Sequence, residues 1–209
     1  MNRDDFQTAA GMAISDAEHA ALQAYADLIV KWNPRINLVS RSTLPDLWQR
    51  HLVDSAQIYP MAPENVPIWA DFGSGGGMPG IILAILSKER SPDTRHVLVE
   101  SDQRKAAFLI EAIRVTGSNA RVLSSRIEAL PPIGAGVVTA RALAALPELL
   151  AWLHPHMAED AVALLPKGAA YQAEVDAAAA EWDFKLKIAA SRTDADARIL
   201  RLTEVNPRS

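Results

Sequence analysis

The sequence predicts an α/β protein in which an N-terminal helical extension precedes a doubly wound, mostly parallel sheet. Before about residue 60, apolar residues recur only at helical spacing. A segment with three prolines in eight residues, 60–67, then separates the two parts. From residue 68 onward, short apolar strands alternate with helices, which is typical of a parallel sheet with crossover helices. We therefore expect a helical extension over residues 1–65 and one α/β domain over residues 66–209.

Two helices are expected in the extension. Ser15 and Glu18 have the spacing of a capping box at the start of the first helix. The apolar residues of this helix follow at Leu22, Tyr25, Leu28, Ile29 and Trp32. A second helix is expected over residues 44–59. The helical phase of Trp32 and Trp48 matches the apolar side, so both are expected in the core rather than stacked on a nucleic-acid base.

Seven strands and four helices are expected after the proline-rich segment. The strands occupy residues 68–73, 96–100, 120–125, 136–141, 161–168, 183–190 and 197–205. Helical patterns fill the intervals at residues 79–90, 101–117, 146–157 and 172–182. Gly117 has the position of a C-terminal helix cap. Only a short polar segment separates the last two strands, so we expect them to pair antiparallel at the C-terminal end.

Composition narrows the classes of function. The 209 residues include no Cys, which excludes disulfides, thiol catalysis and Cys-ligated zinc. No His, Asp and Glu residues have the spacing of metal ligands, so no metal is expected. The net charge of −4 means that nucleic-acid binding must depend on a local basic patch. The longest clean apolar run, 81–86, is too short for a membrane span, and the polar start does not resemble a signal peptide. We expect a soluble, cytoplasmic protein.

The stretch WADFGSGGGMPGI, residues 69–81, follows a predicted strand and precedes a predicted helix. Such a loop lies at the carboxyl edge of a parallel sheet, where ligands bind. A triphosphate-binding loop is excluded, because Ile81 and not Lys follows the last glycine. A dinucleotide fingerprint can be forced onto Gly75, Gly77 and Gly80, but the match is weak.

A second glycine register explains the loop better. Gly73, Gly75 and Gly77 follow Asp71 as G-x-G-x-G, which resembles the first motif of Rossmann-like S-adenosylmethionine-dependent methyltransferases. A phosphate site favours a nearby Lys or Arg, and none lies in residues 69–86. Asp71 instead suits a ligand with an ammonium group, such as the methionine half of this cofactor. The glycines let the backbone approach that ligand without an intervening Cβ.

Residues at the next two strand ends support a ligand that contains adenosine. Glu100 closes the second strand, where a carboxylate can accept hydrogen bonds from both ribose hydroxyls. After the third strand, Ile127 and Glu128 are placed to flank an adenine. These positions suit a dinucleotide as well as S-adenosylmethionine, and each acid taken alone is equally compatible with a surface position. Together with the glycine loop, they favour the adenosine ligand.

Four further motifs carry a more specific resemblance. They are KWNPRINLVS (31–40), RHLVDS (50–55), TARALA (139–144) and LPKG (165–168). With the glycine loop, they resemble the bacterial glucose-inhibited division protein B family from about residue 20 to the C-terminus. The resemblance implies a small-subunit ribosomal RNA methyltransferase that uses S-adenosylmethionine to methylate N7 of a guanine. It also implies a Rossmann-like class I methyltransferase fold, with a mostly parallel seven-stranded sheet and an antiparallel C-terminal strand.

The resemblance also implies roles for single residues. Arg141 matches a family residue of the cofactor site, and Met78 stands where Phe or Leu is expected but keeps an apolar contact. The expected cofactor-binding residues are therefore Asp71, Gly73, Gly75, Gly77, Met78, Glu100, Ile127, Glu128 and Arg141.

Basic residues gather before the proline-rich segment. Between residues 31 and 51, four Lys and Arg residues oppose one acid, Asp46, which leaves a local charge of +3. Such a patch favours contact with the RNA backbone. Asp54 either forms a solvated ion pair with Arg50 or holds Arg50 or His51 beside the cofactor. The RNA-binding candidates are Lys31, Arg35, Arg41, Arg50, His51 and Lys167.

The chemistry of guanine N7 explains why no catalytic residue stands out. N7 carries an exposed lone pair and no proton, so its methylation requires alignment of the reactants and no general base. We expect ribosomal RNA or the small ribosomal subunit as partner, and a monomer. Three alternatives remain open: a small-molecule methyltransferase, an NAD-dependent oxidoreductase, and a non-enzymatic RNA-binding protein.

Overall fold

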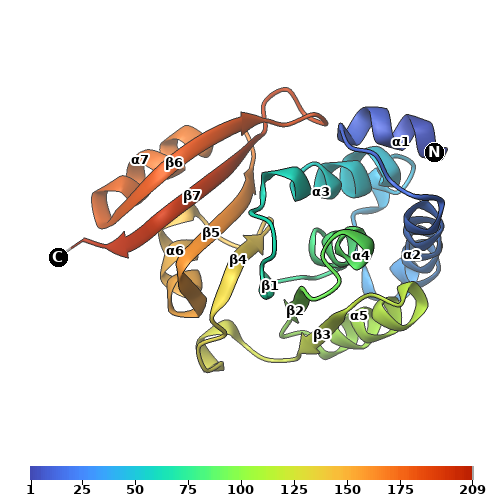
Figure 1. Ribbon diagram of the computed structural model, residues 1–209, viewed down its shortest axis with the longest axis horizontal. Coiled ribbons are helices and arrows are strands. Elements are labelled where there is room, and N and C mark those ends of the chain that lie inside the picture. Colours follow the sequence, from blue (N-terminus) through green and yellow to red (C-terminus); the bar gives the residue numbers. More distant parts are fainter. Residues whose placement is uncertain (209) are drawn as a thin grey trace.

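The computed structural model describes residues 1–208, which form a seven-stranded sheet with helices on both faces (Figure 1). The strand order is β3-β2-β1-β4-β5-β7-β6. The first five strands pair in parallel, and β7 lies antiparallel between β5 and β6. The predicted α/β fold class and the antiparallel C-terminal pair are confirmed. The strands are β1 (Ile68–Phe72), β2 (Arg95–Val99), β3 (Ala120–Leu123), β4 (Ala135–Ala140), β5 (Met157–Lys167), β6 (Trp182–Ala190) and β7 (Arg198–Pro207).

Hydrophobic cores lie on both faces of the sheet. Along β2, Leu98 packs into the core on one face, while its neighbours Val97 and Val99 pack into the core on the other. The first core includes buried residues of α4 (Gly80–Arg90) and α5 (Gln103–Thr116). The second includes those of α6 (Leu146–Leu153) and α7 (Tyr171–Glu181). Because β1 pairs in parallel with both β2 and β4, the carboxyl ends of these three strands lie at the same edge of the sheet.

The N-terminal helices share the first core. These are α1 (Arg3–Ala10) and α2 (Asp16–Ile36). The predicted capping box begins α2: the Glu18 amide donates to Ser15 Oγ at 3.1 Å, and the Ser15 amide donates to Glu18 Oε2 at 2.7 Å. Further along α2, Tyr25 packs against Phe108 of α5. The boundary between residues 65 and 66 stays a prediction.

The second predicted helix of the extension differs from the expectation. A continuous helix over residues 44–59 was expected, but Trp48–Val53 forms the π-helical turn η2, which continues into the short helix α3 (Asp54–Ala56). Short 3-10 turns flank this segment at Arg41–Thr43 and Tyr59–Met61. A π-helical turn bonds residues five apart, so it changes which side chains share a face.

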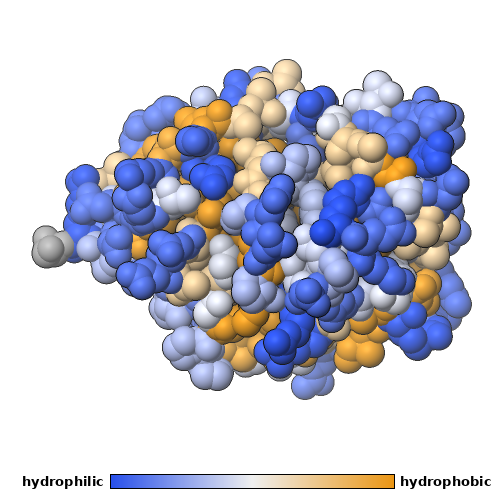
Figure 2. All heavy atoms as spheres, in the orientation of Figure 1, coloured by the Kyte–Doolittle hydropathy of each residue, from blue (hydrophilic) through white to orange (hydrophobic). Residues whose placement is uncertain are grey.

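The tryptophans of the extension pack as predicted. Trp48 meets Phe6 edge to face with ring centroids 5.9 Å apart, and Trp32 meets Phe108 at 5.7 Å. Both are partly buried against the first core, which confirms their place in it. On the face shown in Figure 2, hydrophilic residues dominate, and hydrophobic ones form scattered groups. None of the helices described over residues 1–208 has the length and apolarity to cross a membrane.

Candidate active site

The glycine loop, residues 73–79, joins the end of β1 to the start of α4. Three of its residues have the left-handed backbone that favours glycine: Gly73, Gly75 and Gly77. Gly75 has φ +56°, and its Cβ would meet only the Gly73 carbonyl at 3.7 Å, so it borders open space. Gly77 has φ +85°, and its Cβ would lie 2.6 Å from Ile81 Cγ1. The loop therefore presents bare backbone at the edge of the sheet.

A pocket of about 300 Å³ opens beside this loop, and we call it the glycine-loop pocket. Glu100 lines it, and its Oε2 accepts from the Gly75 amide and its Oε1 from the Asp102 amide, both at 2.8 Å. Each carboxylate oxygen keeps a second lone pair for a ligand hydroxyl. The pocket brings together five of the predicted cofactor-binding residues: Gly73, Gly75, Glu100, Ile127 and Glu128.

The other four predicted cofactor-binding residues do not line this pocket. Asp71 is buried below the loop, where its Oδ1 accepts from Thr139 Oγ1 at 2.8 Å. Gly77 and Met78 are buried at the side of the loop that faces the first core. Arg141 lines a neighbouring pocket. Direct cofactor contact by these four residues stays a prediction.

We expect Asp71→Asn to remove a pH-dependent loss of stability. Burial raises the pKa of Asp71 from 3.8 to about 6, against the opposing effects of the Ser74 and Thr139 hydroxyls and the charge of Arg141. Because the pKa is higher in the folded protein than in the unfolded chain, the protonated Asp71 carboxyl stabilises the folded state. This stabilisation is full below about pH 4 and is lost as the pH rises through about 6. At about 1.4 kcal/mol per pKa unit, the total loss is about 3 kcal/mol.

Urea unfolding of the wild type and the Asp71→Asn variant checks this. From about pH 4.5 to about pH 7.5, the wild-type unfolding free energy should fall by roughly 2 kcal/mol relative to that of the variant. Burial lowers the pKa of His96 to about 3, so its titration also changes stability with pH. This contribution is the same in both proteins and cancels in the difference between their unfolding free energies. A difference that stays constant over this range would contradict the prediction.

A second pocket, of about 380 Å³, shares a lining residue with the first, and we call it the arginine pocket. Ala142 lines both pockets and has a left-handed backbone with φ +53°. This turn follows β4 and separates its neighbours: Arg141 lines the arginine pocket, and Leu143 lines the glycine-loop pocket. The other polar residues of the arginine pocket are Thr43, Arg50, His51, Asp54, Lys167, Glu174, Ser191, Thr193, Asp194 and Arg198.

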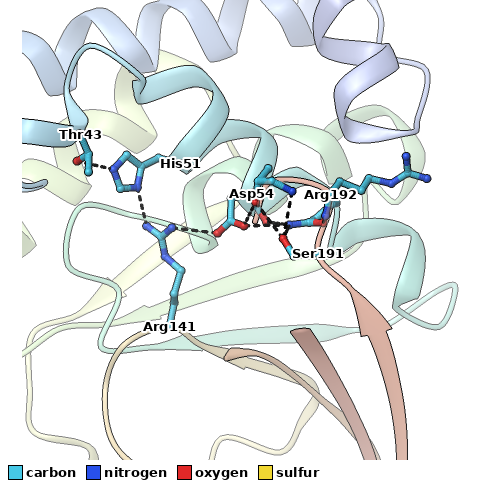
Figure 3. Close-up of polar contacts among 8 residues, drawn as sticks. Thr43, His51, Asp54, Arg141, Ser191 and Arg192 are labelled. Carbon is cyan, nitrogen blue, oxygen red and sulfur yellow. Dashed lines mark hydrogen bonds and ion pairs between the residues drawn. The ribbon is translucent and has the colours of Figure 1, made fainter. Parts of the chain in front are cut away.

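Arg141 connects two residues of the extension (Figure 3). Its Nη1 donates to Asp54 Oδ2 at 3.2 Å, and its Nη2 donates to His51 Nδ1 at 3.2 Å. The opposite nitrogen of His51, Nε2, lies 2.9 Å from Thr43 Oγ1. Because Nδ1 accepts from Arg141, Nε2 carries the proton and donates to Thr43. The guanidinium is therefore fixed between two side chains.

Burial, together with the charges of Arg141 and Arg50, lowers the pKa of His51 to about 4 against the attraction of Asp54. The imidazole is therefore neutral near pH 7, as its acceptor role requires. Asp54 also accepts from Thr193 Oγ1 at 2.5 Å and from Gln57 Nε2 at 2.9 Å. The expectation that Asp54 pairs with Arg50 or His51 is wrong, because its carboxylate holds Arg141 instead.

Lys167 lies in the same pocket but is already bonded. Its Nζ donates to Glu174 Oε2 at 2.7 Å and to the Ala144 carbonyl at 2.8 Å, and its side chain is only 9% exposed. Arg50 is exposed at the pocket rim, and no carboxylate of residues 1–208 pairs with it. RNA contact by these two residues stays a prediction.

The six RNA-binding candidates fall into two groups. Arg50, His51 and Lys167 line the arginine pocket. The others lie outside it and are exposed: Lys31 and Arg35 on α2, and Arg41 in the following turn. The structure thus gathers half of the candidates at the pocket and leaves the other half on the surface.

Sequence patterns missed several residues of both pockets. Leu143 and Trp152 line the glycine-loop pocket. Leu143 lies within the TARALA motif, but only Arg141 of that motif was given a role, and Trp152 lies in an apolar helix. Thr193 reaches the arginine pocket from the connection between β6 and β7, and Arg198 from the start of β7, and neither residue lies in a motif. Over residues 1–208, no three His, Asp or Glu side chains are arranged to hold a metal ion.

Comparison with known proteins identifies the family. The family model for rRNA small subunit methyltransferase G matches residues 18–199. A curated protein of Cereibacter sphaeroides (strain ATCC 17025 / ATH 2.4.3) with the name Ribosomal RNA small subunit methyltransferase G is 46% identical over 202 residues, which is 97% of each chain. A protein of Ruegeria pomeroyi with the same name is 48% identical over 184 residues, 88% of this chain and 90% of that one.

Solved structures support the fold. A methyltransferase from Geobacter sulfurreducens matches with a TM-score of 0.60 at 13% identity, over 88% of each chain. A TehB-like SAM-dependent methyltransferase from Corynebacterium glutamicum matches with a TM-score of 0.57 at 14% identity, over 78% of this chain and 94% of that one. The predicted Rossmann-like methyltransferase fold and the resemblance to the glucose-inhibited division protein B family are confirmed. The chain belongs to the rRNA small subunit methyltransferase G family.

Proposed function

We propose that this protein transfers a methyl group from S-adenosylmethionine to N7 of a guanine in small-subunit ribosomal RNA. One observation carries the proposal: the glycine-loop pocket and the arginine pocket share the lining residue Ala142. A cofactor in the first pocket and a base in the second would then be neighbours, as methyl transfer requires. The partner is ribosomal RNA or the small ribosomal subunit, and we expect a monomer that acts in the cytoplasm.

The residues of the glycine-loop pocket fit the cofactor. Gly75 leaves its backbone open toward the pocket, and the second lone pairs of Glu100 suit ribose hydroxyls. Ile127 offers an apolar contact for the adenine. Lys105 and Arg126 also line this pocket, but they come from α5 and the segment before residue 127, and not from the glycine loop. S-adenosylmethionine, when bound, supplies an electrophilic methyl group on a sulfonium.

The arginine pocket suits a base that becomes cationic. Methylation of N7 places a positive charge on the guanine ring, so an uncompensated cation beside it would raise the barrier. Asp54 compensates Arg141, Glu174 compensates Lys167, and His51 is neutral. Of the two cations of this pocket that pair with no carboxylate of residues 1–208, Arg50 is exposed and Arg198 lies over the Tyr171 ring. A hydrogen bond to N7 would also occupy the lone pair that attacks the methyl group. Because His51 and Asp54 direct two of the Arg141 nitrogens, we propose that Arg141 orients the base through atoms other than N7.

The exposed cations suit the RNA backbone. Lys31, Arg35, Arg41 and Arg50 make no ion pair with the carboxylates of residues 1–208, so their charges remain available for phosphates. The target guanine must be reached outside the base stack, which favours a loop or an unstacked nucleotide.

Chemical mapping of the methylated RNA tests the proposal. Purified protein is incubated with labelled S-adenosylmethionine and either naked small-subunit RNA or small subunits from a deletion strain. We expect label in 7-methylguanosine, and strand cleavage at one guanine after borohydride reduction and aniline treatment. Label on another atom would contradict the N7 assignment. Calorimetric binding of NAD in preference to S-adenosylhomocysteine would contradict the cofactor.

A further inference from the structure

The extension reaches the glycine loop through a tyrosine. Tyr25 lies on α2, fully buried, and its hydroxyl donates a hydrogen bond to the carbonyl of Gly76. We propose that Tyr25 is a positioning residue, whose hydroxyl holds the glycine loop in the shape that binds the cofactor. The inference rests on the proposed placement of the cofactor in the glycine-loop pocket.

The hydroxyl has a role that packing alone does not explain. The ring of Tyr25 packs against Phe108 with centroids 6.4 Å apart, a contact that a phenylalanine ring also makes. Burial raises the pKa of Tyr25, so the phenol keeps its proton and remains a donor. Without it, the Gly76 carbonyl would face an apolar ring in the interior. An unsatisfied buried acceptor costs about 1–3 kcal/mol, and a shift of the loop would relieve that cost.

The loop is held from two sides at consecutive residues. Toward the pocket, the Gly75 amide donates to Glu100 at 2.8 Å, and toward the core, the Gly76 carbonyl accepts from Tyr25. The fit on the core side is tight, because a Cβ on Gly77 would lie 2.9 Å from the Tyr25 hydroxyl. A Cβ on Gly76 would lie 3.3 Å from the Leu38 carbonyl, in the segment that follows α2. A movement of Gly76 therefore also moves the Gly75 amide and the carboxylate that it orients.

Tyr25→Phe tests the inference, because it removes only the hydroxyl. We expect the Kd for S-adenosylhomocysteine, measured by calorimetry, to rise about tenfold. In steady-state kinetics the KM for S-adenosylmethionine should rise, while kcat at saturating cofactor stays near the wild-type value. Hydrogen exchange of the free protein should show faster exchange at residues 73–77, with the exchange of α2 unchanged.

Tyr59→Phe is the matched control. It also removes a tyrosine hydroxyl, but one that is only partly buried and lies 3.4 Å from Ser91 Oγ after α4, without a hydrogen bond to the glycine loop. Its cofactor affinity and loop exchange should equal those of the wild type, even if its melting temperature falls. An equal loss of affinity in both variants would show a general effect of stability and overturn the inference.

Glu100→Ala separates this inference from the proposed cofactor site. If Glu100→Ala loses binding while Tyr25→Phe keeps wild-type affinity and wild-type loop exchange, the role of Tyr25 is wrong and the site stands. If Glu100→Ala binds like the wild type, the cofactor lies elsewhere and both proposals fail. Loss of binding in Glu100→Ala, together with weaker binding and faster loop exchange in Tyr25→Phe, supports both.

Discussion

Replacing Gly75 with valine is expected to abolish cofactor binding while the protein still folds. A Cβ at this position borders open space, so the new side chain would project into the 300 Å³ glycine-loop pocket. The backbone at φ +56° would also resist a β-branched residue, at a cost of about 1–2 kcal/mol. Calorimetry with S-adenosylhomocysteine should show a Kd higher by at least about 100-fold, equivalent to about 2.8 kcal/mol.

Gly134→Val is the control for backbone strain. Gly134 has φ +68°, nothing within 4 Å of its ideal Cβ, and no place in the lining of the glycine-loop pocket. This variant should lose similar stability and keep wild-type cofactor affinity. Wild-type affinity in the folded Gly75→Val variant would mean that the loop is only a turn and that the cofactor lies elsewhere.

The glycine-loop pocket was predictable because its parts follow from local sequence and simple topology. A strand, a glycine-rich turn and a helix are adjacent in the chain, so the loop could be placed without knowledge of distant contacts. Glu100 directly follows β2, and β2 pairs in parallel with β1. Parallel neighbours place their carboxyl ends together, which brings Glu100 to Gly75. Leu143 and Trp152 escaped notice because an apolar pocket wall has the same composition as a core.

The arginine pocket was not predictable in the same way. Asp54 bonds Arg141, 87 residues away, and Thr193, 139 residues away. The second contact depends on the connection that follows β6 and leads into β7, the strand that enters the sheet between β5 and β6. Strand alternation does not reveal that order. The expected pairing of Asp54 with Arg50 assumed an α-helix, but residues 48–53 form a π-helical turn, which changes the faces that residues four apart occupy.

Tyr25 shows a third limit of sequence reasoning. Its position in the apolar series of α2 correctly predicts burial. The same series conceals the hydroxyl, because a buried tyrosine and a buried phenylalanine satisfy the same periodicity. Only the approach of the glycine loop, from 51 residues away in the chain, reveals the acceptor.

Arg141→Lys is expected to reduce RNA methylation strongly and to leave cofactor affinity nearly unchanged. A guanidinium donates to His51 and Asp54 from two nitrogens of one plane, whereas an ammonium offers a single centre. Asp54 keeps its bonds from Thr193 and Gln57, so the fold should tolerate the change. Misplacement of a base by about 1 Å can cost about 100-fold, and we expect a loss of this order in single-turnover methylation at saturating cofactor.

Arg198→Lys is the matched control, because it makes the same exchange in the same pocket. The Arg198 guanidinium donates to the carbonyls of Ala195 and Ala197 and lies over the Tyr171 ring, without an ion pair to Asp54. Its methylation rate should stay near that of the wild type. The family resemblance gave Arg141 a role at the cofactor, and calorimetry separates the two roles. If Arg141→Lys weakens S-adenosylhomocysteine binding and methylates normally at saturating cofactor, the arginine serves the cofactor, and the base must be oriented by other residues.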